Sequence, residues 1–451
     1  MDQTIEQLNS FRLPERLAAL RTLAARRPAA PQDGRNVNMH VHSFFSYNAR
    51  GQSPCRIAWE AREAGLFAVG LCDFDVLDGL EEFHQAGCLL GVRTAVNLET
   101  RAYLREFAQA DINSPGEPGV TYVMGAGFGR VPSAGTPALD VLHGYRERAR
   151  ARNLALVRRV NERLPAIAID YERDVLPLTP AGVATERHIV RAYARRSAQC
   201  FGEGAAWADF WAGVLALAPA AVAALRAREA AFEEQVRSKL AKRGGLGYEP
   251  PTPDTFPPVD DFIAWVLSCR AIPTITWLDG TSEGERDPVR MIECLMAKGA
   301  AALNIIPDRN WNIQDPASRR LKVAKLSEIV DAAERFHLPV NIGTEMNRDG
   351  QPSFDDLAGE ELRPFAETFL RGARIMVGHS LLRRYADLSF VGPETLAEFR
   401  GDLVARNLFF ERAGALPPLT EPLARRLVDM GREKALEVLS ASTAVGQWRL
   451  R

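Results

Sequence analysis

The hydrophobic positions of this chain form short apolar runs of strand length that alternate with amphipathic segments of helical period. Four such runs follow residue 36, at 36–42, 67–75, 93–100 and 119–128. Four more follow residue 259, each after a helical segment, at 272–278, 301–306, 338–346 and 374–380. Continuously apolar strands that alternate with helices predict a parallel sheet covered by helices. Seven or eight such units favour a barrel, in which the chemistry lies where strands end.

Two regions interrupt this alternation. The opening 27 residues have helical periodicity broken at Pro14, and a Pro- and Arg-rich linker follows them. Residues 140–258 are mainly helical and end in a Pro-rich connector. We therefore expect an N-terminal helix and linker at 1–35, a first part of the barrel at 36–139, a helical insertion at 140–258, and the second part of the barrel with C-terminal helices at 259–451.

Composition narrows the class of protein without naming a function. The chain is 46% hydrophobic and 25% charged, and its net charge of -1 gives no electrostatic signal for nucleic acid. The six cysteines are scattered without CxxC pairs, as in proteins of a reducing compartment. The charged N-terminus does not resemble a signal peptide, and no run of about eighteen apolar residues predicts a membrane span. We expect a cytoplasmic protein.

The predicted strands end in ionisable or amide side chains. His40 and His42 are two residues apart, so a strand would point both imidazoles to one face, and neutral imidazole is a common metal ligand. The other strand ends carry Asp73, Asp75, Glu99, Arg101, Asp279, Arg309, Glu345, Asn347 and His379. Each alone has an ordinary role as a helix cap or turn residue. Imidazoles and carboxylates that converge on one barrel mouth would need a cation to offset the cost of burial.

Three segments carry a resemblance to a known family. "MHVHSFFS" at 39–46, "GLCDFDVLDGLEEF" at 70–83 and "TAVNLET" at 94–100 resemble the PHP (polymerase and histidinol phosphatase) superfamily. The resemblance spans residues 36–130 and, more loosely, 260–380. It implies a distorted seven-stranded barrel with up to three zinc, manganese or iron ions that hydrolyses phosphate esters. We therefore expect an α/β fold, a distorted PHP-type barrel of seven or eight β/α units with a helical insertion.

The chain departs from the family pattern at several ligand positions. Phe74 stands where the family has a ligand histidine, Tyr47 where it has an aspartate, and Trp277 at or near a third ligand position. The terminal pair of ligands corresponds to Glu345 and Asn347. Because Phe and Trp side chains cannot bind metal, the resemblance implies fewer than three divalent ions. The expected ligands are His40, His42, Glu99 and Glu345.

The remaining candidates have expected roles around that site. Asp73 and Asp75 are expected to take part in catalysis, and Asp73 is also expected to orient a ligand. His379 is a replacement ligand, a general acid for the leaving group, or a core histidine bonded to backbone. Guanidinium groups bind phosphate in a bidentate manner, unless they pair with surface carboxylates instead. The residues expected to bind substrate are Arg101, Arg309, Asn347 and Asp279.

Three functions remain open. The leading hypothesis is a metal-dependent hydrolase that acts on a small phosphorylated substrate. The alternative is a barrel without catalysis that binds a ligand or partner in an aromatic pocket lined by Phe74, Tyr47 and Trp277. Hydrolysis of an amide or lactone is a third possibility, since fold alone does not determine the reaction.

Two further histidines have predicted places outside the site. His84 is expected on the polar surface of a helix. His188 opens the helical insertion, where it is expected to cap or pack. If the insertion forms a lid, Glu186, Arg187 and His188 would face the pocket instead.

Overall fold

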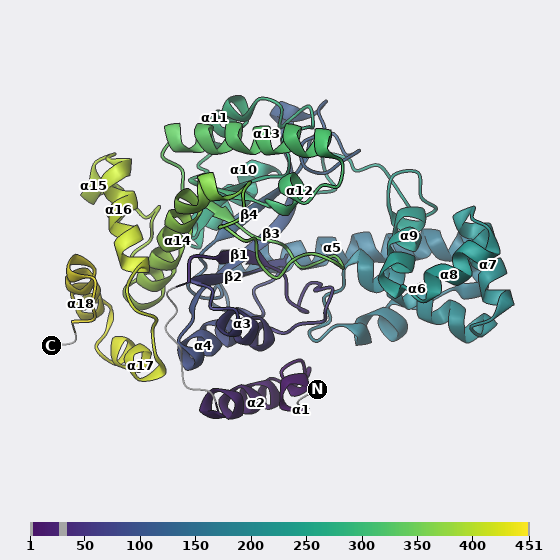
Figure 1. Cartoon of the computed structure of the whole chain (residues 1–451), viewed down its shortest axis with the longest axis horizontal. Helices are drawn as coiled ribbons and strands as arrows, with labels where there is room; N and C mark the ends of the chain where they lie inside the picture. Colours follow the sequence, from purple (N-terminus) through teal and green to yellow (C-terminus); the bar gives the residue numbers. More distant parts are fainter. Residues whose placement is uncertain (1–2, 27–33, 450–451) are drawn as a thin grey trace.

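The computed structural model describes residues 3–26 and 34–449, and its strands form one curled sheet. Seven strands follow one another in chain order: β1 (Val37–Val41), β2 (Ala68–Phe74), β3 (Arg93–Tyr103), β4 (Val120–Ala126), β5 (Ile272–Trp277), β6 (Ala302–Ile305) and β7 (Val340–Ile342). A parallel bridge between Val41 and Glu345 brings the chain beyond β7 back to β1, so the barrel is nearly closed (Figure 1). The predicted fold class, a distorted α/β barrel with helical additions, is confirmed.

One strand runs against the others. β1, β2 and β3 are parallel to one another, as are β5, β6 and β7, but β4 is antiparallel to both β3 and β5. The prediction of a wholly parallel sheet is therefore wrong at β4. The connection 104–119 contains only a short 3-10 turn and no α-helix of the kind that usually covers a parallel crossover. The other six strands still end at one mouth of the barrel.

Four helices begin with the same local signal. Residues Ser53, Thr136, Asp287 and Asp315 each accept a hydrogen bond from the backbone N–H three residues later, and each is followed by a proline. A polar N-cap with proline at the first helical position is a strong start signal. These helices are α3 (Pro54–Glu63), α5 (Pro137–Arg163), α11 (Pro288–Ala297) and α13 (Pro316–Arg335). The barrel is also covered by α4 (Leu80–Leu90) and α10 (Val259–Ser268).

The prediction of an eighth strand at 374–380 is wrong, because this apolar run lies inside helix α14 (Ala366–Ala386). This helix packs closely on two sides. A Cβ atom at Gly372 would lie 1.9 Å from the Val340 carbonyl oxygen of β7, and one at Gly378 would lie 1.9 Å from the Phe410 carbonyl oxygen of α16 (Leu403–Gly414). Because a helix buried on most sides has no polar stripe, its sequence loses the helical period and resembles a buried strand.

The insertion has a hydrophobic core of its own. Beyond α5 it contains α6 (Glu186–Phe201), α7 (Ala205–Leu215), α8 (Pro219–Arg226) and α9 (Glu229–Ala241), which lie to one side of the barrel in Figure 1. Its core centres on Trp211 and Tyr193, which are fully buried in a cluster separate from that of the barrel. No single helix within the described residues is long and apolar enough to cross a membrane, although α7 and α8, bent by 110°, meet the length and composition test together.

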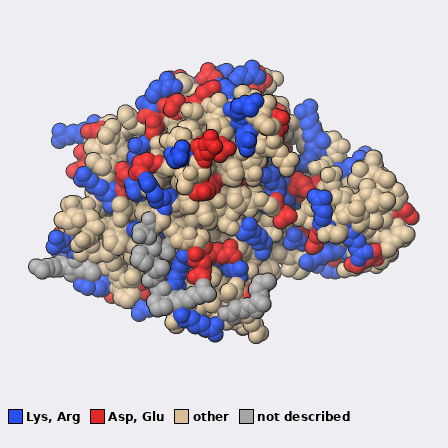
Figure 2. Space-filling model, in the orientation of Figure 1, with Lys and Arg blue, Asp and Glu red and all other residues tan. Residues whose placement is uncertain are grey.

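The two ends of the chain add helices to the barrel. At the N-terminal end, α1 (Gln3–Gln7) and α2 (Leu13–Arg26) form a helical arm beside α3 and α4 (Figure 1), with Pro14 in the first turn of α2. Most of the predicted linker, residues 27–33, lies outside the described residues. The C-terminal part adds a short α15 (Pro393–Phe399), α16, α17 (Glu421–Asp429) and α18 (Arg432–Val445). Positive and negative side chains are interspersed over the face in Figure 2, as the balanced composition predicts.

Candidate metal centre

Strands β1 and β3 bring three candidate ligands together inside the barrel mouth. The Nε2 atoms of His40 and His42 each lie 3.6 Å from Oε2 of Glu99, and all three side chains are buried. The three ligand atoms lie within 4.8 Å of one another. His40 and His42 share a face because they are two residues apart on an extended backbone. The sequence prediction that these residues converge is confirmed as geometry.

The three facing atoms are unusual because they are buried without hydrogen bonds. Within the described part of the chain, neither Nε2 atom nor Oε2 of Glu99 has a hydrogen-bond partner, and 3.6 Å is too long for one. Buried polar atoms without partners are costly. A tetrahedral ion about 2 Å from each ligand would separate ligand atoms by roughly 3.3 Å. The arrangement therefore fits a divalent metal ion.

Burial and mutual charge dominate the electrostatics of this cluster. Burial lowers the pKa of His40, but the Glu99 carboxylate outweighs it and raises that pKa above its usual value. Burial, assisted by the charge of His40, lowers the pKa of His42 to about 3. Burial also raises the pKa of Glu99. A neutral His42 has the protonation state that metal binding requires.

Each imidazole is held from behind through Nδ1. Nδ1 of His40 lies 3.0 Å from Nδ2 of Asn304, which reaches across from β6. Nδ1 of His42 lies 3.4 Å from Oγ of Ser46, and that hydroxyl donates to Oδ1 of Asp73 at 2.7 Å. Such partners orient the ligands of metal sites. Sequence analysis missed Asn304 and Ser46 as partners, although Asn304 stands in an apolar strand where a buried amide needs a reason.

Asp73 and Asp75 lie behind and beside the cluster. Asp73 also accepts hydrogen bonds from the backbone N–H and the hydroxyl of Ser43, both at 2.7 Å, and burial raises its pKa to about 6. Asp75 accepts a hydrogen bond from the Thr100 hydroxyl at 2.6 Å and lies 3.9 Å from Arg152 of α5. Both carboxylates are thus committed to neighbouring groups, and neither belongs to the group of three facing ligands.

Glu345 adjoins the cluster but is held by other groups. Its backbone N–H donates to the His40 carbonyl at 2.8 Å, and its carbonyl accepts from the His42 N–H at 2.9 Å. Its carboxylate accepts hydrogen bonds from Arg309 at 2.7 Å and Gln351 at 3.3 Å. Burial raises the pKa of Glu345, but the Arg309 guanidinium outweighs this effect and lowers it to about 2. Glu345 is therefore an ionised neighbour outside the group of three.

The predicted substrate-binding residues have mixed surroundings. Arg101 lies two residues beyond Glu99 on the same face of β3, where it donates to Glu117 at 2.9 Å and stacks 4.4 Å from the Phe256 ring. Asp279 accepts hydrogen bonds from Lys322 at 2.8 Å and from the Thr281 backbone at 2.9 Å. Asn347 is half-buried, two residues beyond Glu345. Arg309 and Asn347 therefore lie beside Glu345. Asp279 instead forms an ion pair with Lys322 and stabilises a turn at Thr281.

His379 does not stand at a strand end, because the strand expected there is helix α14. It is fully buried, its Nε2 lies 3.0 Å from the Gly127 carbonyl oxygen, and its Nδ1 accepts from the Phe390 N–H at 3.1 Å. Burial lowers its pKa to about 3. Both ring nitrogens are engaged with backbone, as expected for a core histidine.

The three aromatic residues that stand at expected ligand positions lie in different places. Phe74, in register with Glu99, stacks on His42 with ring centroids 4.5 Å apart and 17° between the ring planes. Tyr47 faces the insertion, where its hydroxyl accepts from Arg191 at 3.1 Å. Trp277 pairs with Ile305 rather than with Asn304, so strand alternation places it on the opposite face from the inward Asn304. The three residues therefore do not line one aromatic pocket.

The first turn of α6, within the insertion, packs against Tyr47 near the barrel mouth. His188 caps α6 by accepting from the Thr185 N–H at 3.1 Å, and its ring lies edge-on to Tyr47 at 5.3 Å. This confirms its predicted capping and packing role. Arg187 pairs with Glu234 at 3.0 Å, while its charge contributes to the low pKa of His42. The insertion thus approaches the metal centre through α6.

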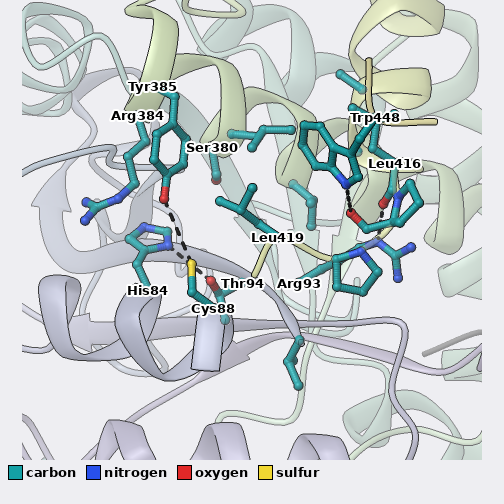
Figure 3. A pocket seen from close by; sticks show the side chains of 17 residues that line it. His84, Cys88, Arg93, Thr94, Ser380, Arg384, Tyr385, Leu416, Leu419 and Trp448 are labelled. Carbon is teal, nitrogen blue, oxygen red and sulfur yellow. Dashed lines mark hydrogen bonds between the residues drawn. The ribbon is translucent and has the colours of Figure 1, made fainter. Parts of the chain in front are cut away.

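His84 is buried, which corrects the prediction of a surface position. Its Nδ1 lies 3.1 Å from the Thr94 hydroxyl, and burial lowers its pKa to about 3. Figure 3 shows it lining a pocket of about 50 Å³ between α4 and α14, near Cys88 and Tyr385. Thr94 stands at the start of β3, so this pocket lies at the other end of the strand from Arg101. Sequence periodicity placed His84 on the polar side of α4, but α14 covers that side.

Comparisons with known proteins give similarity only to solved structures. No family model matches the chain, and no curated protein matches it. One similar structure, provisionally described as a metal-dependent phosphoesterase from Bifidobacterium adolescentis, is 17% identical, with 75% of this chain and 98% of that chain covered and a TM-score of 0.47. Another, an amidohydrolase from Chromobacterium violaceum with bound sulfate and no metal, is also 17% identical, with 74% and 95% covered and a TM-score of 0.46.

Proposed function

We propose that this protein is a metal-dependent hydrolase of phosphate esters with a reduced metal site. The observation that carries the proposal is the group of three buried, facing and unpartnered ligand atoms on His40, His42 and Glu99. Two imidazoles and a carboxylate are the donor set of many hydrolytic metal sites. A divalent ion bound there supplies an activated water and polarises a phosphoryl oxygen.

The protein's own residues supply the rest of the proposed site. Phe74 fills the place beside Glu99 where the resemblance implies another ligand, which supports fewer than three ions. Glu345 would serve as a fourth ligand through Oε1, because Arg309 and Gln351 both donate to its Oε2. The ordinary role of Asp73 is to hold Ser46 and, through it, the ring of His42.

Arg309 and Arg101 are the proposed phosphate-binding groups. Arg309 is the better placed, because its partner Glu345 adjoins both histidines and its own Nε atom is buried without a hydrogen-bond partner among the described residues. The Nε–H group would donate to a phosphate oxygen, while Nη2 stays bonded to Glu345. The half-buried amide of Asn347 would complete this side of the site.

The test begins with metal content. Purified protein is subjected to elemental analysis and then assayed on phosphomonoesters and phosphodiesters with added manganese, zinc or iron. The double variant His40→Ala/His42→Ala is expected to lose both bound metal and activity. The matched control is His143→Ala/His337→Ala, which removes two exposed histidines and should retain both. Equal metal content in the two variants would refute the proposed site.

The stacking of Phe74 on His42 favours a second candidate, a barrel that binds a ligand without turning it over. Phe74 also lies 6.0 Å from the Tyr122 ring, so the two form an aromatic wall next to the histidines. This function predicts less than stoichiometric metal and no turnover of any phosphoester. The same elemental analysis and assays therefore decide between the two functions.

A further inference from the structure

The contact behind His40 has a specific consequence for its protonation. Nδ2 of Asn304 lies 3.0 Å from Nδ1 of His40, and both residues are buried. An amide nitrogen donates but does not accept, so in this orientation Nδ1 of His40 must be the acceptor. In the neutral form of the ring, the single proton then sits on Nε2, the atom that faces Oε2 of Glu99. This tautomer has no lone pair to offer a metal ion at Nε2.

Metal binding at Nε2 requires the opposite tautomer. The proton must move to Nδ1, which then needs an acceptor. Asn304 has one, because its Oδ1 is buried and has no hydrogen-bond partner within the described residues. Turning the amide by half a rotation exchanges its oxygen and nitrogen without changing its shape. Asn304 can therefore satisfy either tautomer of His40.

We propose that Asn304 is a positioning residue whose amide rotates to select the metal-binding tautomer of His40. Metal-free protein has the amide nitrogen toward His40, and metal-loaded protein has the amide oxygen there. This inference rests on the proposed function for the identity of the site, and it adds the group that prepares one of its ligands.

His42 needs no such amide rotation to bind metal, because its Nδ1 has a different neighbour. Nδ1 of His42 faces the hydroxyl of Ser46, whose proton goes to Asp73. The Ser46 oxygen is therefore left to accept from Nδ1–H, which frees Nε2 of His42 for metal. His42 is thus prepared for metal before any ion arrives, whereas His40 requires the amide to turn.

The first test measures the affinity of cobalt(II) or zinc by calorimetry in Asn304 variants. Asn304→Leu removes the acceptor and is expected to weaken binding by roughly 10- to 100-fold. Asn304→Asp keeps an acceptor at Nδ1 and is expected to bind at least as tightly as the wild type. The matched controls are Asn341→Leu and Asn341→Asp, because Asn341 is in register with Asn304 on β7 and is equally buried. They are expected to change affinity less than their Asn304 counterparts.

Two results would overturn the inference. One is wild-type affinity in Asn304→Leu, and the other is an Asn304→Asp protein that loses affinity as severely as Asn304→Leu. Thermal unfolding of the metal-free variants shows whether each still folds. If Asn304→Leu is unfolded, Asn304→Ala takes its place, because it also lacks an acceptor. If Asn304→Asp is unfolded, Asn304→Ser takes its place, because it retains one.

The second test reads the tautomer directly in metal-free protein. With only seven histidines in the chain, ¹⁵N-histidine labelling gives few signals, and His40→Ala identifies those of His40. At a pH high enough for His40 to be neutral, the wild type is expected to carry its ring proton on Nε2, and Asn304→Asp to carry one on Nδ1. A wild-type ring already protonated on Nδ1 would overturn the rotation. This readout does not depend on metal, so it separates a failure of Asn304's role from a failure of the proposed function.

Discussion

The N-terminal arm is anchored by a buried ion pair whose disruption has a calculable effect. Arg16 of α2 donates through Nε to Glu82 of α4 at 2.8 Å and through Nη2 to the second carboxylate oxygen, and both side chains are only 3% exposed. The Arg16 guanidinium also lies 5.1 Å from the Phe44 ring, in the segment that follows His42. We predict that Arg16→Met detaches this arm from the barrel.

The magnitude follows from what remains behind. Without Arg16, the Glu82 carboxylate stays buried with one remaining hydrogen bond, from the Cys55 N–H at 3.1 Å. Leaving one member of a buried pair unpaired costs about 3–5 kcal/mol, whereas replacing both members by apolar residues is often neutral. The double variant Arg16→Met/Glu82→Leu should therefore recover most of the loss. Since methionine is nearly as long as arginine, lost packing contributes little.

Hydrogen exchange of α2 and denaturant unfolding together measure this effect. The exchange protection of residues 13–26 should fall by a factor that corresponds to the predicted cost, or to the whole docking energy of the arm if that is smaller. Arg12→Met removes an exposed pair with Glu15 and should change stability by less than about 1 kcal/mol. Unchanged protection in Arg16→Met, or a double variant as damaged as the single one, would refute the reasoning.

Three other predictions concern pH, packing and metal. Burial raises the pKa of Asp355 to about 7, so the folded protein retains a proton that the unfolded chain loses from about pH 4. Asp355 should therefore contribute a fall of up to about 4 kcal/mol in the free energy of unfolding as pH rises from 4 to 7, and Asp355→Asn should make the slope in denaturant titrations shallower by that contribution. Gly372→Ala should destabilise by more than about 2 kcal/mol because its Cβ would meet a carbonyl of β7, whereas Gly144→Ala, with open space around it, should stabilise α5 by about 0.5–1 kcal/mol in the same assay. Zinc should raise the unfolding midpoint of the wild type in scanning calorimetry but not that of His40→Ala/His42→Ala.

Each of these predictions has an outcome that contradicts it. A pH slope as steep in Asp355→Asn as in the wild type would show that Asp355 does not hold the proton assigned to it. Equal effects of Gly372→Ala and Gly144→Ala would show that α14 can move away from β7 at little cost. A zinc effect of the same size in the double histidine variant would locate binding at other residues.

The sequence predicted most of the barrel because its strands are continuously apolar and its helices begin at clear caps. The strands around His40, Asp73 and Glu99 were predicted nearly residue by residue, and strand alternation alone placed both imidazoles on one face. The errors have physical causes. β4 is antiparallel to β3 and is joined to it without a crossover helix, which the apolar pattern of the strand itself does not reveal. α14 was taken for a strand because burial on most sides removed its polar stripe.

The candidate site was predictable only in part for a related reason. Alternation and strand ends indicate which residues face the mouth, but they do not show which neighbours compete for them. The capture of Glu345 by Arg309 depends on α12 (Asp308–Trp311), a single turn after β6. The partner of His40 comes from 264 residues away in the sequence. Such choices depend on how distant strands align in register, which single-chain periodicity does not record.

The parallel bridge between Val41 and Glu345 joins two parts of the barrel that are far apart in the sequence. All three facing ligands lie between residues 40 and 99, yet the hydrogen bonds that hold the backbone on either side of Val41 come from residue 345. During synthesis, the three ligand residues are thus present long before the segment after β7 that holds the backbone of β1.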